Sequence, residues 1–275
     1  MARIEQISSL ANPKVKSIAA LAQKKERIET GLFVVEGLQL VGFGVEAGWE
    51  LVTLVVGQET KEPKNHGTEV FLSKLYAAAG LILEVTPAVL EKLVRKENPQ
   101  GVVGVFRQRT TPLTDIKVGK DVWVVLEGIR DPGNLGTIIR TVDAVGAKGV
   151  ILAGTCTDLW APEVLRATMG SIFHVPVVHI GVERLLAWKE GARLTMVGTH
   201  LRGTTDYREV AKLRGQNGYG QGLLVAMGTE QSGLSEELTH ACDILTKISM
   251  RGGAESLNLS IATAVMLYEI FRDAA

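Results

Sequence analysis

The sequence is poor in cysteine and in aromatic residues, and it carries no net charge. Its two cysteines, Cys156 and Cys242, are far apart and form no CxxC pair, which argues against a disulfide framework, a zinc ribbon and a cysteine-held iron–sulfur cluster. Aromatic residues are 5% of the chain, so an extensive base-stacking platform is not expected. The 30 basic and 30 acidic residues cancel, which argues against a general polycation, although a local basic face would suffice to bind nucleic acid.

Long apolar runs are missing as well. No run in the 275 residues is long enough to span a membrane, and the N-terminal stretch lacks the apolar core of a signal peptide. For the same reason we expect no membrane partner. The five histidines show no metal-ligand spacing, so we expect no metal site. We therefore expect a protein of the reducing cytoplasm. Hydrophobic residues are 46% and charged residues 22%, which is typical of a folded globular protein, and the length suits two domains.

The first hundred residues alternate between helix-like and strand-like segments. Pro13 opens an amphipathic pattern that predicts one helix over residues 13–29. We expect the following segments after it: strands at 32–37, 50–57, 81–86 and 102–106, and helices up to Ala47, at 73–80 and at 87–97. This alternation predicts a small α/β sandwich domain.

A polar stretch separates this part from a second α/β series. We predict a first domain at residues 1–107, a linker at 108–120 and a second domain at 121–275. The expected strands of the second series are 122–127, 149–154, 172–178, 194–199, 222–228 and 244–250. Several are continuous Val, Ile and Leu runs, as in parallel strands that are covered on both faces. We expect a surface loop over 206–222 and a long helix over 256–272.

The first segment with candidate chemistry is residues 126–150. A strand ends at Glu127, and a Pro–Gly turn leads to Asn134, which we expect at the start of a helix. Arg140 falls off the apolar stripe of that helix and could face a cleft. A capped helix with an exposed arginine explains this segment equally well.

Two further segments combine glycines with polar side chains. Residues 223–238 run from an apolar strand into GTEQSG, where Gly228 and Gly233 would let a ligand approach the main chain and Glu230 adds a carboxylate. The alternative is a strand-to-helix turn capped by Ser235. In residues 247–269, a Gly–Gly turn precedes ESLN, in which Ser256 and Asn258 are helix-capping types.

Together, the three segments carry the motifs NxGxxxR at 134–140, GTExxGL at 228–234 and ISMxGGxESLNLS at 248–260. In this order they resemble the SpoU/TrmH family of RNA 2′-O-ribose methyltransferases, within the SPOUT superfamily, over residues 122–273. The N-terminal part is similar to the substrate-binding domain of the family's ribosomal-RNA members. Two positions depart from the common pattern: Thr229 stands where asparagine is frequent, and Ser249 where proline is frequent.

The resemblance implies an α/β protein whose C-terminal SPOUT parallel sheet contains a trefoil knot. It implies S-adenosyl-L-methionine as cofactor, RNA (ribosomal rather than transfer RNA) as substrate, and a homodimer with active sites at the subunit interface. It places Arg140 at the reaction centre, with Asn134, Glu230, Ser256 and Asn258 around it. The implied cofactor-binding residues are Thr199, Gly228, Thr229, Gly233, Ile248, Met250 and Leu257.

Methyl transfer to a ribose hydroxyl requires that the hydroxyl be oriented and lose its proton. Because arginine stays protonated above pH 12, two roles remain open for Arg140. It acts as the base after a strong perturbation by its cleft, or it grips the target phosphate and stabilises alkoxide charge while another group takes the proton. We favour the second role.

Basic side chains in the N-terminal part are candidates for phosphate contacts with a folded RNA. The predicted RNA-binding residues are Lys14, Lys16, Lys24, Lys25, Arg27 and Lys96. The alternative is a set of solvated helix faces. A non-catalytic RNA-binding protein with a degenerate methylase domain is the second functional hypothesis, and the complete set of motif residues argues against it. A Rossmann-type enzyme is not supported, because no GxGxxG follows an early strand.

Overall fold

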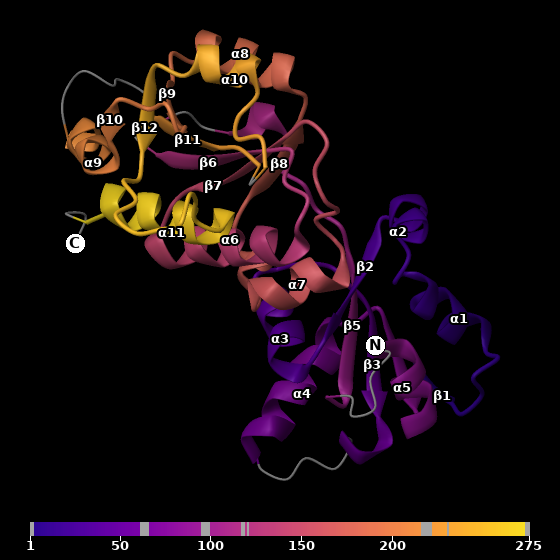
Figure 1. Ribbon diagram of the computed structural model, residues 1–275. Helices are drawn as coiled ribbons and strands as arrows, with labels where there is room; N and C mark the ends of the chain where they lie inside the picture. Colours follow the sequence, from indigo (N-terminus) through magenta and orange to yellow (C-terminus); the bar gives the residue numbers. More distant parts are fainter. Residues whose placement is uncertain are drawn as a thin grey trace. The chain divides into compact units, whose positions relative to one another are not determined.

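The computed structural model describes residues 3–60, 66–94, 100–116, 119, 121–215, 222–229 and 231–272. The chain forms two compact units, which we describe separately. The first unit consists of the N-terminal residues up to Arg109 together with Trp160–Phe173, and the second of Thr110–Leu159 together with the residues from His174 onward. Figure 1 shows the elements of both units. The domain boundaries expected from the sequence stay a prediction.

The first unit is built on a five-stranded sheet in the order β1-β4-β3-β5-β2. Its strands are β1 (Arg3–Ile7), β2 (Leu32–Glu36), β3 (Leu51–Gly57), β4 (Leu81–Val85) and β5 (Val102–Arg107). β4 pairs in parallel with β1 and β3, whereas β5 is antiparallel to β2 and β3. The helices are α1 (Pro13–Ala20), α2 (Lys24–Thr30), α3 (Leu38–Glu46), α4 (His66–Ala78), α5 (Pro87–Val94) and α7 (Pro162–Thr168). The predicted small α/β domain is confirmed.

The predicted single helix over residues 13–29 is wrong, because the chain forms two helices there. α1 ends at Ala20, and Gln23 takes an extended backbone (φ −93°, ψ 135°) before α2 begins. β1 was not predicted. Its sequence RIEQI has only two apolar residues, and pairing with β4 rather than apolar periodicity makes it a strand.

Residues 160–173 belong to an aromatic cluster of the first unit. The ring centroid of Trp160 lies 4.6 Å from that of Phe33, and Phe173 lies 5.2 Å from Phe106. The indole Nε1 of Trp49 donates a hydrogen bond to the carbonyl of Phe173 at 3.0 Å. The expected strand at 172–178 is therefore wrong: residues 171–173 form a 3-10 turn inside this cluster, and the strand begins later.

The second unit is built on a seven-stranded sheet in the order β10-β12-β9-β11-β6-β7-β8, and every neighbouring pair is parallel. Its strands are β6 (Val122–Glu127), β7 (Gly149–Ala153), β8 (Val177–Ile180), β9 (Thr195–Thr199), β10 (Thr205–Asp206), β11 (Leu223–Met227) and β12 (Ile244–Lys247). The helices are α6 (Pro132–Val145), α8 (Val182–Gly191), α9 (Tyr207–Gly215), α10 (Glu236–Ala241) and α11 (Leu259–Ile270). The predicted parallel sheet is confirmed, and the trefoil knot stays a prediction.

The starts of two helices differ from the sequence expectation, and one helix was not expected. Asp131, not Asn134, caps α6, and its Oδ1 accepts from the backbone N–H of Asn134 at 2.6 Å. The last helix begins at Leu259, three residues later than predicted. The glycine-rich stretch expected as a loop contains α9. The Oδ1 of Asp206 accepts a hydrogen bond from the backbone N–H of Arg208 in the first turn of α9. Glycine later in that stretch masked the helical pattern.

A short loop, residues 200–204, crosses the end of β12. β9 and β10 follow one another in the chain, yet they lie on opposite sides of β12, where Thr246 pairs with both Thr199 and Thr205. The backbone N–H of His200 donates to the carbonyl of Thr246 at 2.9 Å. A Cβ at Gly203 would lie 2.6 Å from the carbonyl carbon of Thr246, so only glycine permits this close crossing.

Candidate active site

The candidate site lies at the carboxyl ends of three neighbouring strands. Thr199 ends β9, Gly228 directly follows β11, and Ile248 directly follows β12. Since β9 lies between β11 and β12, the two motif segments leave the sheet on either side of Thr199, about 10 Å apart by strand spacing. The carboxyl edge of an open parallel sheet is the usual place for a ligand crevice.

The loop after β11 is closed by main-chain hydrogen bonds. Thr229 N–H donates to the carbonyl of Gly233 at 3.0 Å, and Gly233 N–H donates back at 2.9 Å. A Cβ at Gly228 would lie 2.0 Å from the carbonyl carbon of Gly233, which excludes any other residue at 228 in this geometry. Gly233 has φ +69°, the left-handed region that favours glycine. Glu230 lies outside the described residues.

Glu127 fixes this loop, a role that the sequence motifs do not indicate. Its Oε2 accepts from the backbone N–H of Ser235 at 2.7 Å, where α10 begins. Ser235 caps α10 by accepting from Leu238 N–H, as the sequence predicts. A carboxylate at a helix N-terminus is favourable, and this one ties the end of β6 to the loop. The signal in the sequence was an acid at the end of a buried strand.

One side-chain hydrogen bond joins the first motif to the third. Asn258 Nδ2 donates to Asn134 Oδ1 at 3.0 Å, across 124 positions of sequence. Asn134 is buried, with 7% of its surface exposed. Asn258 also caps α11, because its Oδ1 accepts from the backbone N–H groups of Ser260 and Ile261. α6 and α11 pack against each other (Figure 1).

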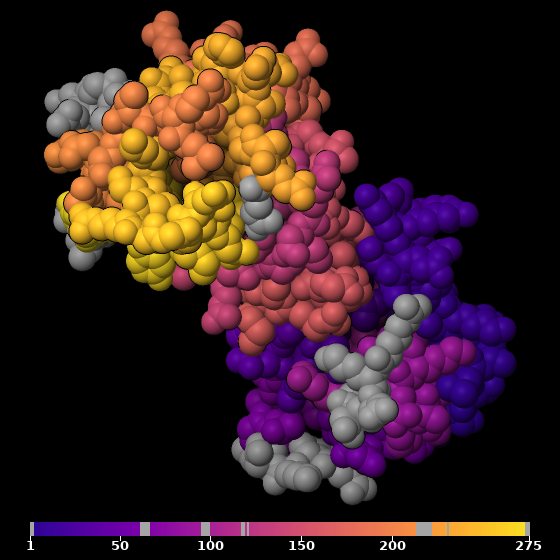
Figure 2. Space-filling view, viewed as in Figure 1, coloured from indigo at the N-terminus to yellow at the C-terminus, as the bar shows by residue number. Residues whose placement is uncertain are grey.

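The segment between β12 and α11 leaves open space around its glycines. An added Cβ at Gly252 or Gly253 would meet no atom within 4 Å, and the same holds for Gly233. Ser256 and Met250 are exposed, whereas Ile248 and Leu257 are half-buried. Figure 2 shows a hollow between the orange and yellow parts of the second unit. Glycine main chain, open space and half-buried apolar groups fit a flat nucleoside ligand.

Arg140 lies on the exposed side of α6. It is six residues after Asn134, about 9 Å along the helix axis. The apolar stripe of α6 is buried at Leu135, Ile138, Ile139 and Val142, so the predicted orientation of the helix is confirmed. Within the described residues, no hydrogen bond or ion pair engages the guanidinium of Arg140.

Both cysteine thiols are unsuited to catalysis. Burial, reinforced by the charge of Asp243, raises the pKa of Cys242 to about 12. Burial likewise raises the pKa of Cys156. Since the thiolate is the reactive form, neither side chain is a nucleophile near neutral pH. Within the residues that the structure describes, no group of three or more His, Cys, Asp or Glu side chains could hold a metal ion.

The predicted RNA-binding residues of the first unit do not share one environment. Lys16, Lys24 and Lys25 are exposed, whereas Lys14 pairs with Glu5. Arg27 departs from the prediction: only 4% of it is exposed, and its Nη1 donates to the carbonyl of Leu21 at 2.7 Å. Its guanidinium binds the backbone carbonyl at the C-terminal end of α1 instead of facing solvent. Lys96 lies outside the described residues.

Comparison with known proteins decides the family. Residues 121–268 match the SpoU rRNA Methylase family, which is more than half of the chain. The chain belongs to the SpoU rRNA methylase family. The resemblance inferred from the three motifs is thereby confirmed. Residues 12–104 of this SpoU methylase match the MRM3-like substrate binding domain.

Two relatives and one solved structure are similar to this SpoU methylase over most of their length. It is 28% identical to a 23S rRNA (guanosine(2553)-2′-O)-methyltransferase of Bacillus subtilis, covering 97% of this chain and 99% of the relative. It is 31% identical to a 23S rRNA (uridine(2479)-2′-O)-methyltransferase of Streptomyces viridochromogenes, covering 92% and 87%. A crystal structure of an AdoMet-bound rRNA methyltransferase from Sinorhizobium meliloti matches with a TM-score of 0.87 and 43% identity, covering 99% of each chain. The predicted fold class is confirmed.

No helix among the described residues combines the length and the apolar character that crossing a lipid bilayer requires.

Proposed function

We propose that this chain transfers a methyl group from S-adenosyl-L-methionine to a ribose 2′-hydroxyl of ribosomal RNA. The observation that carries the proposal is the hydrogen bond from Asn258 to Asn134, which joins the first and third motifs. The second motif follows β11 at the same edge of the sheet. The relatives named above act on 23S rRNA and support ribosomal RNA over transfer RNA.

The donor would bind to main chain on either side of Thr199. Gly228 and Ile248 offer backbone groups there, and the open space at Gly233, Gly252 and Gly253 leaves room for a nucleoside. The bound donor supplies a methyl group attached to a sulfonium. The thioether that remains after transfer is a good leaving group and needs no metal. The half-buried Leu257 and the exposed side chain of Met250 would exclude water from one side of the adenosine.

Arg140 acts on the acceptor in this proposal. An exposed guanidinium with no polar partner among the described residues suits a phosphate oxygen, which it would bind in bidentate fashion. From there it would also stabilise negative charge on the attacking ribose oxygen. Asn134 orients the start of α6, and Ser256 is exposed where it can hydrogen-bond the ribose. In this role, a group other than Arg140 takes the hydroxyl proton.

A second copy of the chain would complete the site. α11 exposes Ile261 (52%) and Tyr268 (61%), seven residues apart and so on one side of the helix. Apolar side chains in such a row are unusual on a monomer surface and fit a homodimer interface beside α6. This arrangement would bring Arg140 to the cleft of its partner. A cytoplasmic location stays a prediction.

The test measures transfer from tritiated donor to ribosomal RNA from a strain that lacks this gene. Arg140→Ala is expected to lose methylation and to keep its affinity for S-adenosylhomocysteine in calorimetry. Arg184→Ala, an exposed arginine on α8, is the matched control and should keep both. Turnover at the wild-type rate in Arg140→Ala would remove this residue from the mechanism.

Two further measurements separate the alternatives. A non-catalytic RNA-binding protein would bind RNA without taking up S-adenosylhomocysteine. Mapping 2′-O-methyl sites in total RNA with and without the gene would show whether the lost site lies in ribosomal or transfer RNA. For the dimer, Ile261→Lys should shift the mass in solution from two chains to one, measured by light scattering.

A further inference from the structure

Three cations lie around the donor end of the sheet, and none of them pairs with a carboxylate among the residues that the structure describes. Arg202 is in the loop that crosses β12, next to Gly203, whose Cα packs against the backbone of Thr246. Lys247 is the residue after Thr246, and Arg251 follows four residues later in the third motif. We call Arg202, Lys247 and Arg251 the rim cations. They border the segment proposed to hold the donor.

The rim cations are exposed and unengaged. All three have more than a third of their surface exposed, and within the described part of the chain no hydrogen bond or ion pair involves their side chains. The segment 247–258 contains one acidic residue, Glu255, so the rim carries a net positive charge. Leu201, beside Arg202, is 82% exposed and adds an apolar surface of the kind that packs against a nucleoside.

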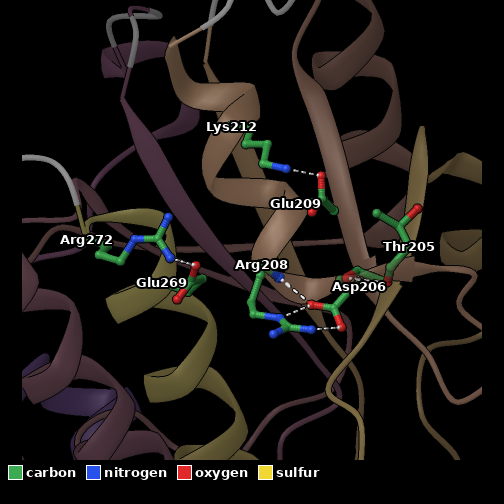
Figure 3. A network of polar contacts seen from close by, with 8 residues as sticks. Thr205, Asp206, Arg208, Glu209, Lys212, Glu269 and Arg272 are labelled. Atoms are coloured by element: carbon green, nitrogen blue, oxygen red, sulfur yellow. Dashed lines mark hydrogen bonds and ion pairs between the residues drawn. The ribbon is translucent and has the colours of Figure 1, made fainter.

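Nearby cations on α9 and α11 behave differently. Arg208 Nε lies 2.7 Å from Asp206 Oδ1, Lys212 Nζ lies 2.6 Å from Glu209 Oε2, and Arg272 Nη1 lies 2.7 Å from Glu269 Oε1 (Figure 3). Each of these charges is neutralised within three residues of sequence. These three cations are paired locally, whereas the rim cations are not, and the rim cations lie where the donor is proposed to bind.

We infer that the rim cations bind the phosphates that flank the target nucleotide and so position its ribose against the donor. The inference rests on the proposed function. It adds an RNA contact in the second unit to the basic residues predicted to bind RNA in the first unit. Unpaired Lys and Arg side chains attract the RNA backbone with little regard to base identity, and they orient it without reading sequence. The rim cations are positioning residues in this account.

The experiment compares the triple variant Arg202→Ala/Lys247→Ala/Arg251→Ala with the control Lys212→Ala/Arg272→Ala, which removes paired cations of similar exposure. RNA affinity is measured by filter binding across a salt series, and methylation by tritium transfer. In the triple variant, the slope of log affinity against log salt should fall by about 2 to 3, since each phosphate contact contributes about 0.7 to 0.9. The KM for RNA should rise, while affinity for S-adenosylhomocysteine stays near wild type.

Charge-preserving substitutions supply a second arm. Arg202→Lys/Arg251→Lys should keep the salt slope, because phosphate attraction needs charge rather than the guanidinium shape. The inference is overturned if the triple variant keeps the wild-type slope and KM, or if it loses S-adenosylhomocysteine binding, which would make these residues part of the donor site. A wild-type chain that methylates no RNA contradicts the proposed function instead, and the salt slope still decides the rim cations.

Discussion

Asn258 serves α11 and Asn134 at the same time. Its Oδ1 accepts from the first N–H groups of α11, and its Nδ2 donates to Asn134 Oδ1 at 3.0 Å. One amide therefore sets where the last helix begins and holds the buried asparagine of the first motif. The two tasks can be separated by substitution, because a helix cap needs only an acceptor close to the backbone.

Asn258→Ala should lower the free energy of unfolding by about 1 kcal/mol through the lost cap, and it should also reduce methylation. Asn258→Ser keeps a good capping group that is too short to reach Asn134. We expect Asn258→Ser to unfold close to wild type in urea and yet to lose activity like the alanine variant. Full activity in Asn258→Ser would mean that the bond to Asn134 has no functional role.

Glycine substitutions distinguish loop packing from ligand space. Gly228→Ala places a Cβ about 2 Å from the backbone of residues 233 and 234, so the loop must open and donor affinity should fall along with stability. Gly253→Ala meets no atom of the chain. If a donor occupies that space, Gly253→Ala weakens S-adenosylhomocysteine binding while leaving the unfolding midpoint unchanged. Unchanged binding would place the donor elsewhere.

Trp160 should stabilise the first unit, although it lies far along the chain from the rest of it. It is 6% exposed and packs on Phe33 and Trp49. Trp160→Ala should cost about 3–5 kcal/mol in denaturant unfolding, as for other buried aromatic truncations. Trp188→Ala, at a half-buried position of the second unit, should cost less. A fragment ending at Arg109 should expose the aromatic cluster and bind a hydrophobic dye.

The pH dependence of the Asp206–Arg208 pair follows from its geometry. The side-chain and backbone N–H groups of Arg208 lower the pKa of Asp206 from 3.8 to about 2. A carboxyl whose pKa is lower in the folded state stabilises the fold above its unfolded pKa, and that contribution disappears as the pH falls from about 4 to about 2. Carboxyl-carbon NMR titration should give the low value in wild type. In Arg208→Ala the pKa should return toward 3.8, and an unchanged value would contradict the pairing. Because solvent reaches both side chains, the effect on stability should be small.

Sequence patterns predicted the parallel sheet well, because its strands are continuous runs such as VWVVLE and LLVAM. They failed where tertiary contacts override local preference. The polar β1 is a strand because β4 pairs with it, and residues 171–173 turn because Phe173 belongs to the aromatic cluster. Arg27 looked like one more exposed cation of a basic face, and nothing local signals that its guanidinium folds back onto Leu21.

The candidate site was partly predictable for a similar reason. Motif spacing identified Asn134, Gly228 and Asn258, which the structure brings to one edge of the sheet or into direct contact. Glu127 was overlooked because its partner is a backbone N–H 108 residues away. The rim cations were not apparent, because they come together only through the strand order. Residues 200–204 cross β12 and so bring Arg202 close to Lys247.

That strand order also has a consequence for synthesis. β12 fills an interior place between β9 and β10, which are made some forty residues earlier and are joined by a loop of five residues. A nascent chain therefore holds a gap in its sheet until residues 244–247 have left the ribosome. Translation that stops short of this strand leaves two unsatisfied strand edges, and the donor site cannot assemble before the chain is nearly finished.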